Sequence, residues 1–428
     1  MTPLDPAILS WDLRTIVQKD KEFYKETMIP DLSGLYSKNA LNMKRSEIRE
    51  LLKLTRQPDI ISFAGGLPDP QTFPVKELAD ISAQVLREKG ATALQYGPTE
   101  GEPALREALA NWLTKERLDL RAENILVTSG SQQALDLLAQ VLIDPGDPVI
   151  VELPSYIGAL QAFAAHRARM IGVPQDDEGI RTDLLEKALE RLSRRKRRPK
   201  FIYIVPDFQN PSGVTLTLAR RQELLRLADR FEVPLVEDSP YRVLRFSGEP
   251  MPAIYSLDPQ RHVLALGTFS KIFCPGMRLG WLLTPEAWME RFIIAKQGMD
   301  LCSPSFTQFI AVEYMRRGLL DREVENIRSL YSRKLGVMLA ALEKEMPRGV
   351  TWTRPEGGLF LWMKLPRRMN ATALFSKAIE RKVAYVIGSA FFCNGKGHHT
   401  MRLNFSYPSE EQIVEGIQRL AQVIRENL

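Results

Sequence analysis

The chain has 428 residues, of which 44% are hydrophobic and 26% charged, and this ordinary globular composition excludes intrinsic disorder, collagen and coiled coil for its bulk. The formal net charge of +6 is small against 58 basic and 52 acidic residues, so it favours anionic ligands in general and gives little support to a nucleic-acid partner. A chain of this length can bury a large core without a metal or a disulfide, and at roughly 150 residues per domain it suggests two or three domains.

The cysteines and the N-terminal residues bear on the cellular compartment. Cys274, Cys302 and Cys393 lie far apart and form no C-x-x-C pair, so we expect no disulfide framework, no metal site and a reducing compartment. The first fifteen residues carry Asp5 and Asp12 and lack the order of a signal peptide. No apolar run approaches the roughly 20 residues that a membrane span needs. These features predict a soluble, cytoplasmic protein.

The predicted elements begin with a helix at residues 46–54, within an otherwise mixed first 60 residues. From about residue 100, short β-branched runs alternate with helical periodicity, which predicts a mostly parallel sheet with helices on both faces. In such sheets ligands bind at the carboxyl ends of the strands, so the loops after the strands should carry the chemistry. The expected strands are 125–128, 149–152, 200–205, 234–237 and 263–268, and the expected helices are 132–143, 157–165 and 218–231.

The pattern changes from about residue 323 and predicts a smaller α+β domain. We expect a long helix at 323–345, strands at 350–353 and 359–364, a helix at 371–381, a strand at 401–405 and a terminal helix from residue 410. We therefore divide the chain into an N-terminal segment of the small domain (1–60), a large domain (61–322) and the C-terminal small domain (323–428). The basic run at 194–198 ends a helical pattern, where cations suit the helix dipole, and we interpret it as a solvated helix end.

The most informative segment is 268–278, which follows an expected strand. Lys271 has a hydroxyl residue, Ser270, before it and Arg278 after a Pro-Gly turn. A lysine in this place can form a Schiff base with an aldehyde cofactor, while the arginine and the hydroxyl can bind a phosphate. An ordinary surface turn is the alternative interpretation of this segment taken alone.

Three further strand ends agree with a phosphorylated pyridine cofactor. Ser131 begins a helix after a strand, where exposed N–H groups favour phosphate, although a plain serine cap is the alternative. Asp238 ends a strand, and at about 3 Å and an effective dielectric near 20 its pairing with a protonated ring nitrogen is worth about 5 kcal/mol before desolvation. Tyr241 and Asn210 can both form a hydrogen bond with a phenolic oxygen. The alternatives are that Asp238 caps the next helix and that Asn210 belongs to an ordinary turn.

Together with the strings 62–68 (Ser-Phe-Ala-Gly-Gly-Leu-Pro), 93–98 and 208–211, these motifs resemble the fold-type I, pyridoxal-phosphate-dependent aminotransferases of class I/II. The resemblance runs from about Ser46 to the C-terminus. It is closest to the subgroup of 2-aminoadipate (LysN-type), kynurenine and aromatic aminotransferases. It implies an α/β fold, with a three-layer, mostly parallel sheet in the large domain and a smaller α+β domain built from the N- and C-terminal segments.

The resemblance also implies a role for each matched residue, with pyridoxal 5′-phosphate as the cofactor. Lys271 would form the internal aldimine and then move the proton of the substrate α-carbon. The remaining cofactor contacts would be Asp238 to the pyridine nitrogen, Asn210 and Tyr241 to the phenolic oxygen, Tyr156 on the ring, and Ser131, Gln132, Thr268, Ser270 and Arg278 at the phosphate.

Other matched residues concern the substrate and the neighbouring subunit. Arg402 would bind the substrate α-carboxylate as a bidentate fork, together with Asn210, and Gly66 would let the backbone approach the substrate. Tyr96 would reach the phosphate of the neighbouring subunit, which implies a homodimer with shared sites. Arg49 would meet a distal carboxylate of the substrate, or else be a helix-surface arginine paired with a glutamate.

The implied activity is ping-pong transfer of the amino group of an L-amino acid, of the 2-aminoadipate, leucine or aromatic type, to 2-oxoglutarate. One alternative is another enzyme of the same fold, such as a C–S lyase or a decarboxylase. The other is a transcription regulator that binds pyridoxal phosphate, but the roughly 45 residues before the match are too few for its DNA-binding module. We expect no nucleic-acid and no membrane partner.

Overall fold

The structure is a computed structural model that describes residues 33–42, 59–115, 120–258 and 262–428. The chain divides into two compact units, residues 1–42 and 43–428. In the first unit the described elements are a 3-10 turn at Ser33–Leu35 and helix α2 (Lys38–Asn42). The helix expected at 46–54 lies outside the described residues and stays a prediction.

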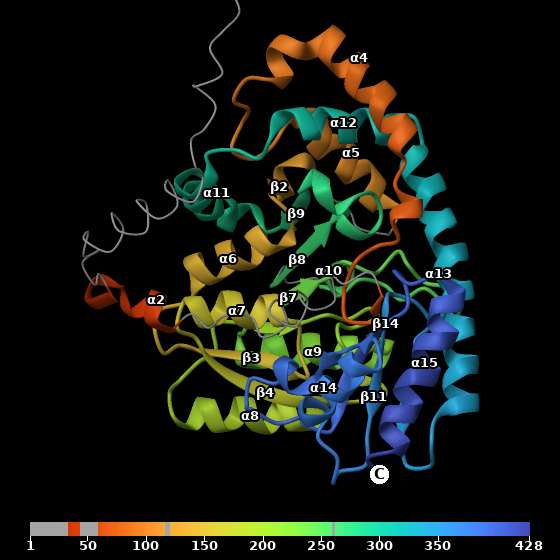
Figure 1. Ribbon diagram of the computed structural model, residues 1–428. Coiled ribbons are helices and arrows are strands. Elements are labelled where there is room, and N and C mark those ends of the chain that lie inside the picture. The colour runs from red at the N-terminus through yellow and green to blue at the C-terminus, as the bar shows by residue number, and fades with distance from the viewer. Residues whose placement is uncertain (1–32, 43–58, 116–119, 259–261) are drawn as a thin grey trace, which may run out of the picture. The chain divides into compact units, whose positions relative to one another are not determined.

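An eight-stranded sheet forms the centre of the second unit (Figure 1), in the order β2-β9-β8-β7-β6-β3-β4-β5. Strand β9 is antiparallel to β2 and β8, and β5 is antiparallel to β4, while the other pairs are parallel. The predicted mostly parallel sheet is therefore confirmed. The strands are β2 (Ile125–Thr128), β3 (Pro148–Leu153), β4 (Arg169–Asp176), β5 (Gly179–Ile180), β6 (Ile202–Ile204), β7 (Leu235–Asp238), β8 (Val263–Thr268) and β9 (Gly280–Leu283).

Helices cover both faces of this sheet, so its strands are apolar on both sides. On one face α6 (Ser131–Leu142) and α7 (Ile157–Ala165) pack in one cluster with Tyr203 and Val236. On the other face α8 (Thr182–Arg194), α9 (Leu218–Phe231) and α10 (Ile254–Leu257) pack with Ile202 and Leu235. Because neighbouring side chains of a strand point to opposite faces, the central strands β3, β6, β7 and β8 contribute to both clusters, and the three-layer fold is confirmed.

The sequence predicted neither the short α10 nor four longer helices of this unit: α4 (Val75–Ala93), α5 (Pro103–Thr114), α11 (Glu286–Asp300) and α12 (Ser305–Arg316). Helices α4 and α11 leave large apolar side chains exposed, such as Leu86 and Ile294. In α11 the apolar side chains are spread around the helix, so the apolar stripe that marks a helix in a sequence is weak there. Among the helices within the described ranges, none is long and apolar enough to cross a membrane.

The C-terminal residues build a second, antiparallel sheet in the order β10-β11-β14-β13, with α14 (Ala371–Glu380) and α15 (Glu410–Arg425) beside it. Helix α13 (Leu319–Glu345) lies along α15 (Figure 1). The elements expected here are present, although α13 begins four residues earlier than expected. The strands of this sheet are β10 (Thr351–Trp352), β11 (Phe360–Lys364), β13 (Val386–Ile387) and β14 (Thr400–Asn404). A separate two-stranded sheet pairs β1 (Ile61–Ser62) in parallel with β12 (Val383–Ala384). The boundary between a large and a small domain stays a prediction.

Candidate active site

The strands that precede the expected site residues all end at one edge of the large sheet. Strands β3, β6, β7 and β8 are mutually parallel, and β2 runs the same way because both it and β8 are antiparallel to β9. A cavity of about 170 Å³ opens at this edge. Its lining contains all the expected cofactor residues except Tyr96, namely Ser131, Gln132, Tyr156, Asn210, Asp238, Tyr241, Thr268, Ser270, Lys271 and Arg278. Val205, Pro240 and Pro275 complete the lining.

One end of the cavity is built for an anion. Ser131 is the first residue of α6, where N–H groups lack partners within the helix. The Arg278 side chain lies across the preceding turn, and its Nη2 donates to the carbonyl of Ser129 at 3.2 Å. Gly130 has φ +79°, and a Cβ there would lie 2.5 Å from Arg278 Nη2. Only glycine therefore leaves room for the guanidinium beside the start of the helix.

Two hydroxyls continue this end of the cavity. The Thr268 hydroxyl lies 3.0 Å from that of Ser270 and accepts the Ser270 backbone N–H at 3.2 Å. Because Thr268 ends β8 and Arg278 precedes β9, the antiparallel pairing of these strands brings them together. A Cβ at Gly280 would lie 2.8 Å from the backbone nitrogen of Ser131, so this approach is also close.

The carboxylate of Asp238 lies on the α6 and α7 face of the sheet. Its Oδ2 accepts a hydrogen bond from the Tyr203 hydroxyl at 2.7 Å. Its Oδ1 is buried and has no hydrogen-bond partner among the described residues. Burial raises the pKa of Asp238 to about 6, against the opposing effect of the Tyr203 bond. An unpaired acceptor of this kind suits a cationic N–H donor in the cavity.

Asn210 and Tyr241 come from different loops, after β6 and β7, and meet in the cavity. The Asn210 Nδ2 donates to the Tyr241 hydroxyl at 3.3 Å. The Tyr241 ring packs edge-on against Phe360, with 5.8 Å between ring centroids. Burial raises the pKa of Tyr241, so the hydroxyl keeps its proton and can donate it in a hydrogen bond.

The Lys271 amine is partly buried beside the same groups. Its Nζ donates to the carbonyl of Gly66 at 2.8 Å. Burial, and then the positive charges of Arg402 and Arg278, lower the pKa of Lys271 to about 8. A larger fraction of the amine is then neutral near physiological pH, and only the neutral amine is a nucleophile.

Arg402, on β14, lies next to the cavity. Its Nη1 donates to Asn210 Oδ1 at 2.9 Å and its Nη2 to the Ala64 carbonyl at 2.7 Å. The guanidinium stacks 4.1 Å from the centroid of the Phe360 ring, and burial lowers its pKa to about 10. A Cβ at Gly66 would lie 4.0 Å from Arg402 Nη2. The backbone at Gly66 and the Arg402 guanidinium therefore lie close together beside Asn210.

The structure places neither Tyr96 nor Arg49 in or beside the cavity. The Tyr96 side chain is 77% exposed, in the loop between α4 and α5. Arg49 lies outside the described residues, so its role stays a prediction. Tyr203, the partner of Asp238, was not predicted as a site residue. Its position in β6, beside Val236 of the adjacent β7, could have indicated that its side chain lies on the same face of the sheet as Asp238. In the described part of the chain, no group of three or more His, Cys, Asp or Glu could hold a metal ion.

Most of the chain is similar to known proteins of one family. The family model of aminotransferase class I and II matches residues 58–420. Aromatic-amino-acid aminotransferase 1 of Thermococcus litoralis is 48% identical over 400 residues, which is 93% of this chain and 96% of that protein. The Pyrococcus horikoshii kynurenine aminotransferase, in complex with PMP and KYN as substrates and KYA as products, matches with a TM-score of 0.91 at 46% identity, over 94% of this chain and 100% of that one.

LysN, the α-aminoadipate aminotransferase of Thermus thermophilus, is a further similar structure. It was solved in complex with N-(5′-phosphopyridoxyl)-L-leucine and matches with a TM-score of 0.86 at 41% identity. The match covers 92% of this chain and 98% of that chain. The similarity to these proteins therefore extends over the described cavity and both sheets.

Proposed function

Since the chain belongs to the class I and II aminotransferases, we propose that it moves the amino group of an L-amino acid to 2-oxoglutarate, using the cavity beside Lys271. The protein is a transaminase whose substrates are amino acids and 2-oxo acids. Its cofactor is pyridoxal 5′-phosphate.

The unpaired Oδ1 of Asp238, in the same cavity as Lys271, is the observation that carries this proposal. A buried acceptor without a partner is costly, and a protonated pyridine nitrogen would satisfy it. At the other end of the cavity, Ser131, Ser270 and Arg278 offer donors to a phosphate. The residues present therefore fit the cofactor.

The remaining contacts follow from the same geometry. Asn210 and Tyr241 would donate to the phenolic oxygen, Tyr156 would cover the ring, and Gln132 and Thr268 would complete the phosphate end. When bound, the cofactor supplies the sink for the electrons that leave the substrate α-carbon. Lys271, with its lowered pKa, would take up and return the proton at that carbon. Arg402 would hold the substrate α-carboxylate next to Asn210.

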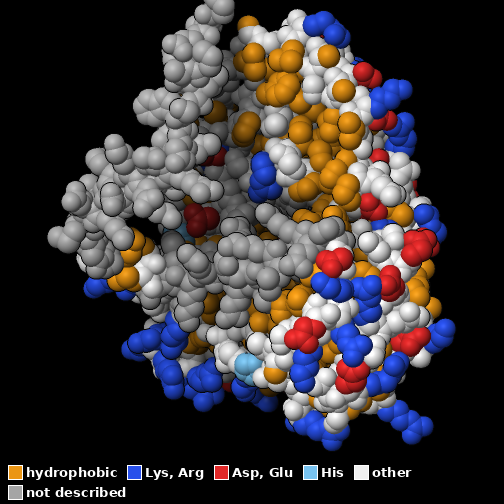
Figure 2. Space-filling model, in the orientation of Figure 1, with side chains coloured by type: hydrophobic (Ala, Val, Ile, Leu, Met, Phe, Trp, Pro, Cys, Tyr) orange, Lys and Arg blue, Asp and Glu red, His pale blue; other side chains and the backbone are white. Residues whose placement is uncertain are grey.

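We also propose a homodimer with shared sites, in which Tyr96 contacts the phosphate of the neighbouring subunit. Large apolar side chains stay exposed in and after α4 and on α11, among them Val75, Leu94 and Ile294. Figure 2 shows hydrophobic side chains gathered over α4 and α12. Exposed apolar surface of this kind is typical of an interface between protein chains.

The donor is proposed from the relatives, which are named for aromatic amino acids, 2-aminoadipate and kynurenine. We expect the protein to accept 2-aminoadipate, leucine or aromatic amino acids. Arg49 is the proposed contact to a distal carboxylate of the donor.

The test is product analysis with purified protein, pyridoxal 5′-phosphate, each candidate donor and 2-oxoglutarate. Glutamate and the 2-oxo acid of the donor, formed in equal amounts, would support transamination. Ammonia formed without consumption of 2-oxoglutarate would indicate a lyase, and carbon dioxide would indicate a decarboxylase. Either of these results would contradict the proposal.

A further inference from the structure

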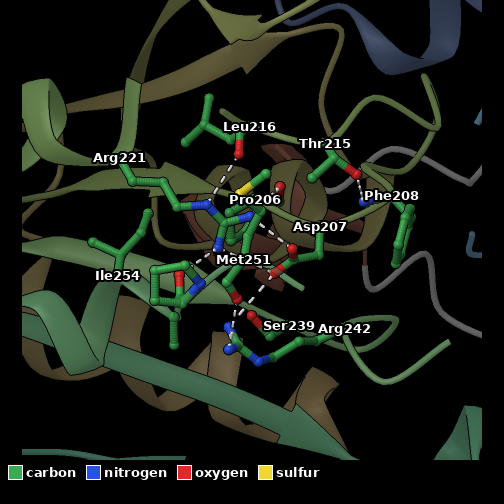
Figure 3. A network of polar contacts seen from close by, with 12 residues as sticks. Pro206, Asp207, Phe208, Thr215, Leu216, Arg221, Ser239, Arg242, Met251 and Ile254 are labelled. Atoms are coloured by element: carbon green, nitrogen blue, oxygen red, sulfur yellow. Dashed lines mark hydrogen bonds and ion pairs between the residues drawn. The ribbon is translucent and has the colours of Figure 1, made fainter. Parts of the chain in front are cut away.

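Four charged side chains gather on the face of the large sheet that is covered by α9 and α10, opposite the cavity. They are Asp207, Arg221, Glu237 and Arg242, and we call them the ionic cluster; Figure 3 shows three of them, Asp207, Arg221 and Arg242. The Arg221 side chain is fully buried, and those of Asp207 and Glu237 are nearly so. Two cations and two carboxylates balance each other within the cluster.

Arg221 closes the loop that carries Asn210. Its Nη2 donates to the carbonyl of Pro206 at 3.2 Å and its Nε to the carbonyl of Leu216 at 3.0 Å. These carbonyls lie at the two ends of the loop, before and after Asn210. One guanidinium on α9 therefore fixes both ends of this loop by directional bonds.

The same guanidinium also binds the Asp207 carboxylate. Arg221 Nη2 lies 2.6 Å from Asp207 Oδ1, and Nη1 lies 3.4 Å from Oδ2. A fifth bond runs from Nη1 to the carbonyl of Pro252 at 2.9 Å. A buried ion pair often contributes little net stability compared with apolar residues, so its presence here calls for another reason.

Arg242 connects this loop to the strand end of β7. Its Nη1 lies 3.8 Å from Asp207 Oδ2 and 3.9 Å from Glu237 Oε1, and its Nη2 donates to the carbonyl of Met251 at 2.9 Å. Glu237 accepts the backbone N–H groups of Ile254 and Tyr255 at the start of α10. The cluster thereby joins the loop after β6, the end of β7 and α10.

Each member of the cluster other than Arg221 is close in sequence to a residue of the cavity. Glu237 precedes Asp238 on β7, and because neighbouring side chains of a strand alternate, one points to the cluster and the other to the cavity. Arg242 directly follows Tyr241 along the chain, and Asp207 lies three residues before Asn210. The cluster is therefore placed to fix the backbone of both loops.

We propose that the ionic cluster is a positioning device for the loops of Asn210 and Tyr241. It holds the two loops so that both side chains point into the cavity and keep their hydrogen bond. This inference rests on the proposed function, in which both residues donate to the phenolic oxygen of the cofactor. The hydrogen-bonded pair of Arg221 and Asp207 suits the task because hydrogen bonds are directional, whereas apolar contacts are not. None of the four side chains needs to contact the cofactor.

The test uses the pH midpoint of the visible absorbance change of the bound cofactor. Donors to a phenolic oxygen stabilise its charged form, so their loss raises this midpoint. In Asp207→Asn, which keeps the size of the side chain and removes its charge, we expect a rise of about half to one pH unit relative to the wild type. Asp229→Asn, an exposed carboxylate on α9 that pairs with His262, is the matched control and should leave the midpoint unchanged.

A double-variant cycle separates positioning from a general loss of stability. Tyr241→Phe removes the hydrogen bond to Asn210, so Asp207→Asn should add little to its effect if the cluster acts through that bond. A folded Asp207→Asn protein with an unshifted midpoint, or shifts that add in full, would overturn the proposal. If thermal unfolding shows that Asp207→Asn does not fold, Arg242→Lys, which keeps the charge but loses the planar fork, is judged by the same criteria.

The wild type separates this inference from the proposed function. A wild-type protein that binds no pyridoxal 5′-phosphate would contradict the proposed function itself. A wild type with a normal cofactor absorbance and an unshifted Asp207→Asn variant would contradict only the role of the ionic cluster.

Discussion

At the scale of single residues, the reactivity of Lys271 depends on keeping its amine neutral. Its pKa is lowered from 10.5 to about 8 by burial and by Arg402 and Arg278. The cofactor-free protein should therefore react with pyridoxal, which lacks the phosphate, at a rate that rises with pH and is half-maximal near pH 8. Stopped-flow absorbance measures this rate. In Arg278→Gln the half-maximal pH should move upward, and a wild-type value above 10 would contradict the account.

The lowered pKa of Lys271 has a consequence for stability as well. Between about pH 8 and 10.5 the unfolded chain holds a proton on this amine that the folded chain has lost. The contribution of the amine to the free energy of unfolding therefore rises with pH across this window. Urea unfolding of the cofactor-free wild type and of Lys271→Met measures this contribution. The free energy of unfolding of the wild type, minus that of the variant, should increase from pH 8 to 10, and a constant or decreasing value would contradict the lowered pKa.

Asp238 should matter through its charge. Asp238→Asn keeps the shape and the bond to Tyr203 but cannot hold a protonated ring nitrogen as an ion pair. A hydrogen bond to a charged group is worth about 1.5–3 kcal/mol, so kcat should fall by about 10- to 100-fold. Asp183→Asn, on the surface of α8, is the control and should behave as the wild type. An unchanged kcat in Asp238→Asn would show that catalysis does not depend on an ion pair between Asp238 and the ring nitrogen.

At the scale of the elements, the turn before α6 sets the place of Arg278. Gly130→Ala would force a left-handed residue to carry a Cβ next to Arg278 Nη2, a strain of about 1–3 kcal/mol. The Kd for pyridoxal 5′-phosphate, measured by equilibrium titration, should rise about tenfold or more. Gly276→Ala is the matched control, since nothing lies within 4 Å of the added Cβ. Equal Kd values in the two variants would show that the turn does not place the guanidinium.

The sequence predicted some of the buried strands and missed others. Strands β2 and β8 and helices α7 and α9 were predicted with their observed ends, because short β-branched runs and clear periodicity mark them. The antiparallel strand β9 was not predicted, because its residues, Gly-Trp-Leu-Leu, include no β-branched side chain. Lys271, Asp238 and Asn210 were predicted from their places after strands, whereas the ionic cluster depends on contacts between loops that no single segment reveals.

At the scale of the whole molecule, the proposed homodimer makes a prediction about mixed subunits. If Tyr96 serves the neighbouring site, both substitutions of a Lys271→Ala and Tyr96→Ala hybrid dimer fall in the same site, and its other site is intact. Refolding an equal mixture should then restore activity to about a quarter of the wild type, because about half of the dimers are hybrids with one intact site. Activity no higher than the average of the two variants alone would contradict shared sites.

Transamination in this cavity should depend on Lys271, and glutamate formation by matched variants tests this dependence. Purified wild type, Lys271→Ala and the surface control Lys187→Ala are each incubated with pyridoxal 5′-phosphate, L-2-aminoadipate or an aromatic L-amino acid, and 2-oxoglutarate, and glutamate is quantified over time. We expect glutamate from the wild type and the control, and none above background from Lys271→Ala, which also loses the visible absorbance of the bound cofactor. Glutamate formation by Lys271→Ala at the wild-type rate would contradict the claim.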